Sequence, residues 1–385
     1  MTRAGLAWAL LLAGCALSHG REAPGDAGPE PPRSRPRWRA IEAGDYFSCA
    51  LALDGVAWCW GSNGSGQLGV GGGEAEIFAP RRVDTDARFR QLSAGASHLC
   101  GVDDMAQLYC WGSNINLALG TGDEANRDRP TRVVAVATEI IEVRAGAFHT
   151  CASDVFGDVY CWGSNSRGQC GVPDVRAVPR PSAPVLDGAL ALASGDSHSC
   201  ALRVDGVWCW GSGERGQRGD GGETSPEPRR VPGVEGARGL FAGGTTTCAT
   251  GPFGVRCWGG NEHGQAGDGG GPDRETPVDA SSLPREVVEI EQGANNHACL
   301  LGEDRRVRCW GFAGSGRLGD GTEEERRDPV EPLGLPNAGD VAVGAGHGCA
   351  LSLDDRVHCW GLNLSGQLGE GPEGNRPFPA EVAFP

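Results

Sequence analysis

Cysteine is the residue type whose spacing in this sequence most directly suggests chemistry. Fourteen of the 16 cysteines recur as pairs with nine or eight residues between them, and each pair closes with Cys-Trp-Gly. Such pairs could bind a metal, but zinc knuckles separate their ligands by about two to four residues, and pairs in different repeats would lie too far apart to complete one shell. We therefore expect no metal site and predict seven disulfides. The predicted bonds are Cys49–Cys59, Cys100–Cys110, Cys151–Cys161, Cys200–Cys209, Cys248–Cys257, Cys299–Cys309 and Cys349–Cys359.

The other reactive side chains follow the same repeat, which indicates structural roles. Cys170 stands where other repeats carry leucine, as at Leu68 and Leu368, so we expect a small buried apolar residue and not a nucleophile. A histidine precedes the first cysteine by two residues in five repeats, which could bind metal or transfer protons, but regular repetition favours a shared hydrogen bond in every unit. We expect no catalytic residue, no cofactor and no enzyme activity. The five histidines are His98, His149, His198, His297 and His347.

The cysteine pairs need a tight β-hairpin to bring them together. In the first repeat apolar and polar residues alternate from Cys49 up to Asp54-Gly55 and again up to Cys59, which predicts two strands joined by a turn at residue 54. Cysteines that face each other on antiparallel strands have Cα separations compatible with a disulfide. The fourth and fifth repeats are one residue shorter, and we expect a four-residue loop, 203–206 and 251–254, to preserve the pairing.

The hairpin recurs seven times with a period of about 50 residues, which is typical of propellers. Each hairpin follows a short apolar strand that ends in a small residue and glycine, as in Ala43-Gly44, and precedes a Gly-Gln-Leu-Gly run or a variant of it. A fourth strand is expected near a proline, at Pro184-Val185 in the third repeat. Four strands in each of seven repeats predict an all-β fold, a seven-bladed β-propeller over residues 38–385.

The start of the chain predicts export. One basic residue, Arg3, precedes the apolar run 6–13, which is too short to span a bilayer. Leu12-Ala13-Gly14-Cys15 resembles the lipobox of bacterial lipoproteins, and this resemblance implies a signal peptide over residues 1–15 with lipid attached to Cys15. The alternative is an ordinary signal peptide that is cut a few residues later. Residues 16–37 are rich in proline and charge, so we expect a disordered tether.

The repeats also carry a family resemblance. The pattern G-x-x-H-x-C-A-L…D-G-x-V-x-C-W-G-S-N-x-x-G-Q-L-G, from Trp38 to Pro385, resembles the repeat of the regulator of chromosome condensation family. The resemblance implies a seven-bladed β-propeller. It also implies several functions: the nuclear member exchanges guanine nucleotides on a small GTPase and binds chromatin, whereas a secreted bacterial relative inhibits β-lactamases. The export signal, the cysteine pairs and the net charge of −16 disfavour exchange activity and nucleic-acid binding in this chain.

The segments that differ most between repeats lie after the hairpins, and loops on a rigid scaffold commonly carry recognition. We therefore hypothesise a monomeric, exported module, in the bacterial cell envelope or outside the cell, that binds another protein, such as a basic one, through these acidic loops. The alternatives are an inhibitor of a secreted hydrolase and an unrecognised enzyme. The variable segments are 70–79, 121–129, 172–180, 220–228, 268–276, 320–328 and 370–378. The acidic residues proposed for binding are Glu74, Asp123, Glu223, Asp273, Glu323, Glu324 and Glu325.

Overall fold

The computed structural model describes residues 36–134, 138–371 and 374–385. Residues 36–385 form one compact unit. In the described part of this unit, the regular secondary structure consists of β-strands and a 3-10 turn at Gly314–Gly316. The expected signal peptide, and the expected tether except for residues 36 and 37, lie outside the described residues. Among the residues that are described, no helix has the length and apolar character needed to cross a bilayer.

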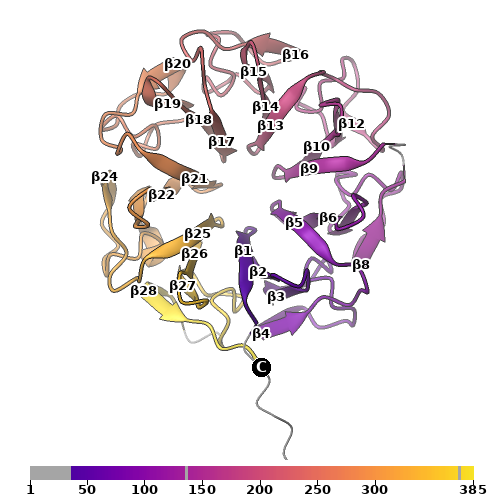
Figure 1. Cartoon of the computed structure of the whole chain (residues 1–385), viewed down its shortest axis with the longest axis vertical. Helices are drawn as coiled ribbons and strands as arrows, with labels where there is room; N and C mark the ends of the chain where they lie inside the picture. Colours follow the sequence, from indigo (N-terminus) through magenta and orange to yellow (C-terminus); the bar gives the residue numbers. More distant parts are fainter. Residues whose placement is uncertain (1–35, 135–137, 372–373) are drawn as a thin grey trace, which may run out of the picture. The chain divides into compact units, whose positions relative to one another are not determined.

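The strands form seven antiparallel sheets, each made of four consecutive strands, so the predicted seven-bladed propeller is confirmed. Figure 1 shows the first strand of each sheet pointing toward a common centre and the fourth strand at the rim. We number the sheets as blades 1 to 7 in chain order. Their bounds are as follows: blade 1, β1 Trp38–Ala43, β2 Phe47–Ala52, β3 Ala57–Ser62 and β4 Glu76–Arg82; blade 2, β5 Phe89–Ala94, β6 His98–Asp103, β7 Leu108–Gly112 and β8 Arg127–Arg132; blade 3, β9 Ile140–Ala145, β10 His149–Asp154, β11 Val159–Ser164 and β12 Ala177–Val178; blade 4, β13 Ala189–Ser194, β14 His198–Arg203, β15 Gly206–Gly211 and β16 Ser225–Arg230; blade 5, β17 Gly239–Gly243, β18 Thr246–Gly251, β19 Gly254–Gly259 and β20 Arg274–Asp279; blade 6, β21 Val287–Gly293, β22 His297–Gly302, β23 Val307–Gly311 and β24 Arg326–Val330; blade 7, β25 Ala338–Val343, β26 His347–Ser352, β27 Val357–Gly361 and β28 Arg376–Glu381.

The central hairpin of each blade has the register that the cysteine spacing predicts. Cys49 pairs with Cys59 across β2 and β3, and every other cysteine pair is opposed in the same way. In blade 4 the turn lies within the expected segment 203–206, but Arg203 and Gly206 already pair as strand residues, so Val204 and Asp205 alone connect β14 to β15. The register follows from local sequence, because the strands are joined by turns of two or four residues, whose length sets the pairing.

The fourth strand of blade 3 differs from the prediction. The strand is Ala177–Val178, which pairs with the end of β11, whereas the expected Pro184-Val185 segment forms no strand and only Leu186 makes an isolated bridge to Val159. Three prolines at 179, 181 and 184 follow β12. Proline has no N–H to donate to a neighbouring strand, so the ladder ends early here.

Tryptophan and glycine bring neighbouring blades into contact. The seven Cys-Trp-Gly tryptophans are fully buried. Six of them donate Nε1–H to a backbone carbonyl of the preceding blade, as Trp210 does to Gln169 at 2.9 Å. The final glycine of the Gly-Gln-Leu-Gly run in blade 1 lies against the tryptophan of blade 2. A Cβ added to this residue, Gly69 (φ +67°), would be 2.5 Å from Nε1 of Trp111. The regular tryptophans are therefore packing residues.

The glycines after the inner strands lie equally close to the next blade. A Cβ on Gly95 would be 2.5 Å from the carbonyl oxygen of Gly146, and one on Gly146 would be 2.5 Å from that of Gly195. The backbone of each blade thus approaches the next one too closely for any side chain. This crowding explains why the sequence repeats a small residue and glycine at this point.

No strand is exchanged between the first and last blades, because β1–β4 and β25–β28 form separate sheets. The contact between them is made by side chains. The Ser48 hydroxyl donates to the carbonyl oxygen of Gln367 at 2.9 Å and lies 2.9 Å from Nε2 of His347. Phe384, which follows β28, packs against Trp38 and Trp60. These contacts close the ring of sheets.

Candidate functional site

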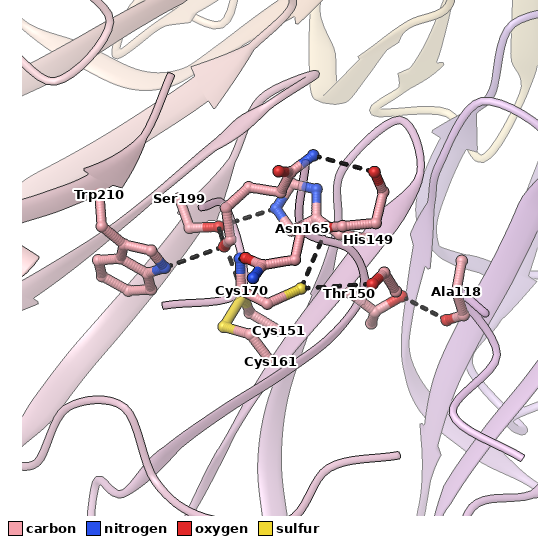
Figure 2. Close-up of a disulfide and its surroundings, with 12 residues drawn as sticks. Ala118, His149, Thr150, Cys151, Cys161, Asn165, Cys170, Ser199 and Trp210 are labelled. Carbon is pink, nitrogen blue, oxygen red and sulfur yellow. Dashed lines mark hydrogen bonds between the residues drawn. A yellow bond between two sulfur atoms is a disulfide. The ribbon is translucent and has the colours of Figure 1, made fainter. Parts of the chain in front are cut away.

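The predicted histidines lie at blade interfaces and not in an open site. His149 Nε2 is 2.8 Å from the hydroxyl of Ser199 in the next blade, and that hydroxyl donates to the carbonyl oxygen of Gln169 (Figure 2). Because the Ser199 proton is used in this way, His149 donates from Nε2. Burial lowers the pKa of His149 to about 3, so the ring is neutral at pH 7. The equivalent contacts are His98 with Thr150, His198 with Thr247 and His347 with Ser48.

His297 is the exception to this pattern. The residue that would contact it in blade 7 is Gly348, which has no hydroxyl, and neither ring nitrogen of His297 has a hydrogen-bond partner in the described part of the chain. A Cβ on Gly348 would be 2.6 Å from the indole of Trp360, so this site cannot take the serine or threonine found elsewhere without rearrangement. His297 is therefore buried without the inter-blade hydrogen bond that the other four histidines make.

The sulfur atoms of all seven expected cysteine pairs are bonded in the structure, and their Cα atoms are 4.0 to 4.1 Å apart. Each pair is buried at the middle of the second and third strands of its blade. Cys170 is fully buried beside the Cys151–Cys161 bond (Figure 2), and burial raises the pKa of its thiol. A buried thiol that stays protonated is a poor nucleophile, as expected for a packing residue.

Two sets of connections meet at one end of the ring, which we call the loop face. It carries the turns after the inner strands and the loops between the third and fourth strands. In blade 1 the N–H of Ser62, at the end of β3, donates to the carbonyl oxygen of Tyr46 in the inner turn at 2.8 Å. The same bond recurs in the other six blades: Ser113 to Ser97, Ser164 to Phe148, Ser212 to Ser197, Gly260 to Thr245, Phe312 to Asn296 and Leu362 to Gly346.

Buried asparagines hold the outer loops of this face. Asn165 accepts a hydrogen bond from the N–H of Cys170 and donates from Nδ2 to the carbonyl oxygens of Val172 and Val175 (Figure 2 labels Asn165 and Cys170). The side chain thus satisfies backbone groups on both sides of the loop. Asn63, Asn114, Asn261 and Asn363 make equivalent bonds. The loop face is therefore a set of anchored loops.

The acidic residues proposed for binding lie on these loops, but most of them are paired with cations of the same protein. Asp273 binds Arg215 of the preceding blade at 2.8 Å, and Asp123 binds Arg127, the first residue of β8, at 2.7 Å. Glu74, Glu324 and Glu325 also lie in ion pairs, with Arg81, Arg326 and Arg327 respectively. In the described part of the chain, Glu223 and Glu323 are the two proposed residues whose carboxylates form no ion pair. The structure therefore leaves two of the seven charges uncompensated.

Exposed apolar side chains on the loop face were missed by the sequence analysis. Tyr46 and Phe148 occupy the inner turns of blades 1 and 3, where other blades carry serine, threonine, asparagine or glycine. Phe312, Ile115 and Leu364 project from the outer loops, and all five side chains are between 38% and 74% exposed. A comparison of the repeats position by position would have found them, because each replaces a small or polar residue. Exposed aromatic residues are enriched at the centres of protein interfaces.

Arg317 lies beside two of these aromatic residues. It replaces the glutamine of Gly-Gln-Leu-Gly in blade 6 and is 6% exposed. The guanidinium donates to the carbonyl oxygens of Gly314 and Ala345 and lies 4.8 Å from the ring of Phe312. Burial lowers the pKa of Arg317, and the nearby Tyr46 opposes this shift. No carboxylate pairs with Arg317 in the described residues, so a fixed cation lies among exposed aromatic rings.

The inner strands of all seven blades line a cavity of about 340 Å³ around the axis, which we call the central cavity. Its walls carry Glu42, Glu289, Glu291, Asp340 and Arg144. Burial raises the pKa of the Glu42 carboxyl to about 8 and that of Glu291 to about 7, with further repulsion between these acids. Asp45 and Asp196 lie at the end next to the loop face, where burial raises their pKa values to about 6 and about 7. Within the described residues no three acidic, histidine or cysteine side chains are placed to hold a metal ion.

Two models of one repeat family match the chain, both described as the regulator of chromosome condensation (RCC1) repeat. One matches residues 54–102, 106–153 and 157–202, and the other matches 38–67, 140–169, 190–217 and 340–367, so together they cover more than half of the chain. Each match of the first model runs from the central hairpin turn of one blade to the second strand of the next blade.

Individual relatives share parts of this chain. It is 31% identical over 176 residues to the probable E3 ubiquitin-protein ligase HERC6 of Homo sapiens and to the ultraviolet-B receptor UVR8 of Arabidopsis thaliana. These matches cover 43% and 44% of this chain but only 17% and 40% of those relatives. Among solved structures, Prp20p of Saccharomyces cerevisiae superposes with a TM-score of 0.74 at 20% identity, over 90% of this chain and 88% of that one. At this identity the similarity shows a shared fold.

Proposed function

Because the chain belongs to the regulator of chromosome condensation (RCC1) repeat family, we propose that it is a protein-binding module without enzyme activity, exported and anchored by lipid on Cys15. Propellers of this family serve as interaction scaffolds. Seven buried disulfides support export, because such bonds persist in oxidising compartments. The lipobox-like run before Cys15 supports the anchor.

The loop face is the surface that we propose for binding, and one observation carries this proposal. Tyr46 and Phe148 are exposed on inner turns whose carbonyl oxygens accept the N–H groups of Ser62 and Ser164 at the ends of β3 and β11, and the exposed Phe312 donates its own N–H to the carbonyl oxygen of Asn296. Arg317 adds a fixed guanidinium beside Phe312. Aromatic rings and arginine on a preorganised surface are the groups that contribute most free energy in protein interfaces, since little conformational entropy is lost on binding.

The partner is then recognised mainly through apolar contact and less through negative charge. Five of the seven acidic residues first proposed for binding already lie in ion pairs. Exposed ion pairs add little to affinity but keep loops ordered. Glu223 and Glu323 remain as rim charges that favour a basic partner and act on its rate of association.

Site-specific photo-crosslinking in intact cells tests this surface. A photoreactive amino acid at Tyr46 or Phe148 is expected to capture a partner protein, and the same amino acid at Met105 or Val204 provides the control. The control residues are 70% and 88% exposed, but they lie in the hairpin turns at the other end of the strands. Capture from the control positions with none from the loop face would overturn the proposal.

Mutations of the captured complex give the second test. The triple change Tyr46→Ala, Phe148→Ala and Phe312→Ala is expected to weaken the purified complex by about 100-fold or more, since aromatic anchors contribute about 2 kcal/mol or more each at interface centres. Replacement of the exposed Met105, Phe156 and Val204 by alanine is the matched control and is expected to leave affinity unchanged. For the anchor, Cys15→Ala is expected to move the protein from the membrane fraction to the soluble fraction.

A further inference from the structure

The hairpin turns between the second and third strands of the blades lie at one end of the ring, opposite the loop face, and we call this end the turn face. All seven sheets have the same strand order, and their central hairpins are opposed at the cysteines in the same way. The turns therefore end at a similar level around the axis, and a flat surface can touch several of them at once. They are residues 53–56, 104–107, 155–158, 204–205, 252–253, 303–306 and 353–356.

Apolar side chains project from the turns of five consecutive blades, which are blades 7, 1, 2, 3 and 4 of the closed ring (Figure 1). These side chains are between 45% and 88% exposed, so they contribute little to the core. Exposed apolar groups that gather on one face mark a binding surface for a protein or a membrane. We call them the apolar tips: Leu353, Leu53, Met105, Val155, Phe156 and Val204.

The fold of the repeat does not require an apolar tip. In blade 6 the turn is Glu303-Asp304-Arg305-Arg306, and all four residues are exposed. In blade 5, Phe253 is half-buried and its ring lies 5.2 Å from the guanidinium of Arg256. Both blades keep the hairpin register of the other five. The apolar tips therefore have a reason outside the folding of the blades.

The chain enters the propeller among the apolar tips. The carbonyl oxygen of Arg37, directly before β1, accepts the N–H of Leu53 in the turn of blade 1 at 2.8 Å. The guanidinium of Arg37 pairs with Asp355 in the turn of blade 7 at 3.3 Å. The segment that connects Cys15 to the propeller thus ends on the turn face. A polypeptide linker of about 20 residues has a mean end-to-end distance of roughly 25 Å as a coil, so lipid on Cys15 would hold this face close to the bilayer.

We propose that the turn face lies on a phospholipid bilayer, with the apolar tips inserted between the headgroups and the upper acyl chains. This inference rests on the proposed lipid anchor at Cys15. A bilayer is planar and takes up separate apolar tips without a matching shape, whereas a protein partner would have to fit each tip. The linker also raises the effective concentration of the bilayer at this face.

The contact gives the anchored protein a fixed orientation. A lipid on a linker holds a protein at the membrane but leaves it free to rotate, whereas several inserted tips define a plane. Arg39 is exposed beside Leu53, with its Nη2 3.5 Å from that carbonyl oxygen, and it forms no ion pair with a described residue. Its guanidinium can donate to a lipid phosphate at the depth of the tips. The loop face then points away from the bilayer, toward its protein partner.

Photo-crosslinking to lipid tests the orientation without the natural anchor. Residues 16–385 carry a histidine tag at residue 16 in place of the lipid. The tag holds them on vesicles of phosphatidylethanolamine and phosphatidylglycerol that contain a nickel-chelating lipid. A photoreactive amino acid at Met105 or Phe156 is expected to give at least about tenfold more phospholipid adduct than one at Phe148 or Leu364 on the loop face, because only the tips reach the acyl chains. Mass spectrometry of the protein measures the adducts.

Acidic substitutions on the untagged chain give a second measurement. The variant with Met105→Asp, Phe156→Asp and Val204→Asp is expected to partition onto the same vesicles, made without the chelating lipid, at least about tenfold more weakly, since burial of apolar area drives insertion. The three side chains are well exposed, so the variant is expected to fold. The matched control changes Ile115, Val175 and Leu364 on the outer loops to aspartate, with the same change in charge, and is expected to partition like the unchanged chain.

The inference is overturned by equal lipid adducts from both faces, by adducts to a second copy of the chain in place of lipid at Met105 and Phe156, by no lipid adduct at these positions, or by equal partition of the two variants. These results are separate from the test of the anchor. If Cys15→Ala left the protein in the membrane fraction, the lipid anchor would be wrong, while the vesicle measurements would still decide whether the turn face binds a bilayer.

Discussion

The ring of Phe384, which follows β28, lies 4.2 Å from the ring of Trp38, the first residue of β1. The same phenyl ring meets Trp60 edge-on at 5.7 Å. Since no strand is exchanged between blades 1 and 7, this aromatic contact joins the first and last blades together with the hydrogen bonds of Ser48. Together with the buried core that blades 1 and 7 share, these side-chain contacts close the ring.

Phe384→Ala is expected to lower the free energy of unfolding by about 2–3 kcal/mol, through lost burial and lost aromatic contact. Urea unfolding followed by tryptophan fluorescence measures the change. Phe378→Ala is the control, because that ring is 47% exposed and lies in β28 itself, and a change within about 0.5 kcal/mol is expected. Equal effects of the two substitutions would argue against closure by Phe384.

The hydrogen bond between His149 and Ser199 is expected to couple blades 3 and 4. In a double-mutant cycle with His149→Ala and Ser199→Ala, we expect a coupling energy of about 1 kcal/mol, because each single change leaves a buried polar partner unsatisfied. The control cycle combines His347→Ala with Ser199→Ala, which lie in blades 7 and 4. Additivity within about 0.5 kcal/mol is expected there, and similar coupling in both cycles would contradict a direct bond.

The protein is expected to become less stable as the pH rises from about 7.5 to about 9. Glu42 and Glu291 have folded pKa values raised to about 8 and about 7, so the folded state binds more protons than the unfolded chain up to those values. Their contribution to stability is present at low pH and is lost as the pH rises through the folded pKa. The buried histidines act in the opposite direction, because their lowered pKa values remove stability as the pH falls below about 6.5.

Above about pH 7.5 the histidines are neutral in both states, so the carboxyl groups decide the sign. Urea unfolding at about pH 7.5 and about pH 9 measures the effect, and Glu42→Gln is expected to reduce the difference. The control is Glu74→Gln on an outer loop, which is expected to leave the difference unchanged. A free energy of unfolding that rises over this pH interval would contradict the protonation of Glu42 and Glu291 in the folded protein.

Thiol titration is expected to distinguish Cys170 from the other cysteines. In a Cys15→Ala variant, 15 of the 16 cysteines remain. We expect no reactive thiol in the native protein, one after unfolding without reductant, and 15 after reduction, because Cys170 is buried and the other fourteen are bonded. Removal of one bond by Cys151→Ser with Cys161→Ser is expected to cost about 3 kcal/mol or less. Additional thiols in the unfolded, unreduced protein would contradict the pairing.

The sequence by itself determined the features that depend on neighbours within about ten residues. The pairing of Cys49 with Cys59 follows from an alternating pattern and a turn between them, and both are local. Repetition of this unit at a constant period then predicted the number of blades. Loop 203–206 could be predicted for the same reason, since the one-residue deletion lies inside the hairpin that it adjusts.

Only the tertiary structure decided which distant residues meet. Glu291 and Glu42 are about 250 positions apart in the chain but lie on one arc, because blades 6, 7 and 1 are neighbours once the ring closes. Asp273, first considered a free binding charge, is paired with Arg215 of the adjacent blade. The alternating pattern of a strand predicts the face of the sheet on which a side chain lies. The residues that contact this side chain belong to the next blade, which the pattern does not identify. For that reason the loop ion pairs and the acidic central cavity became visible only in the folded protein.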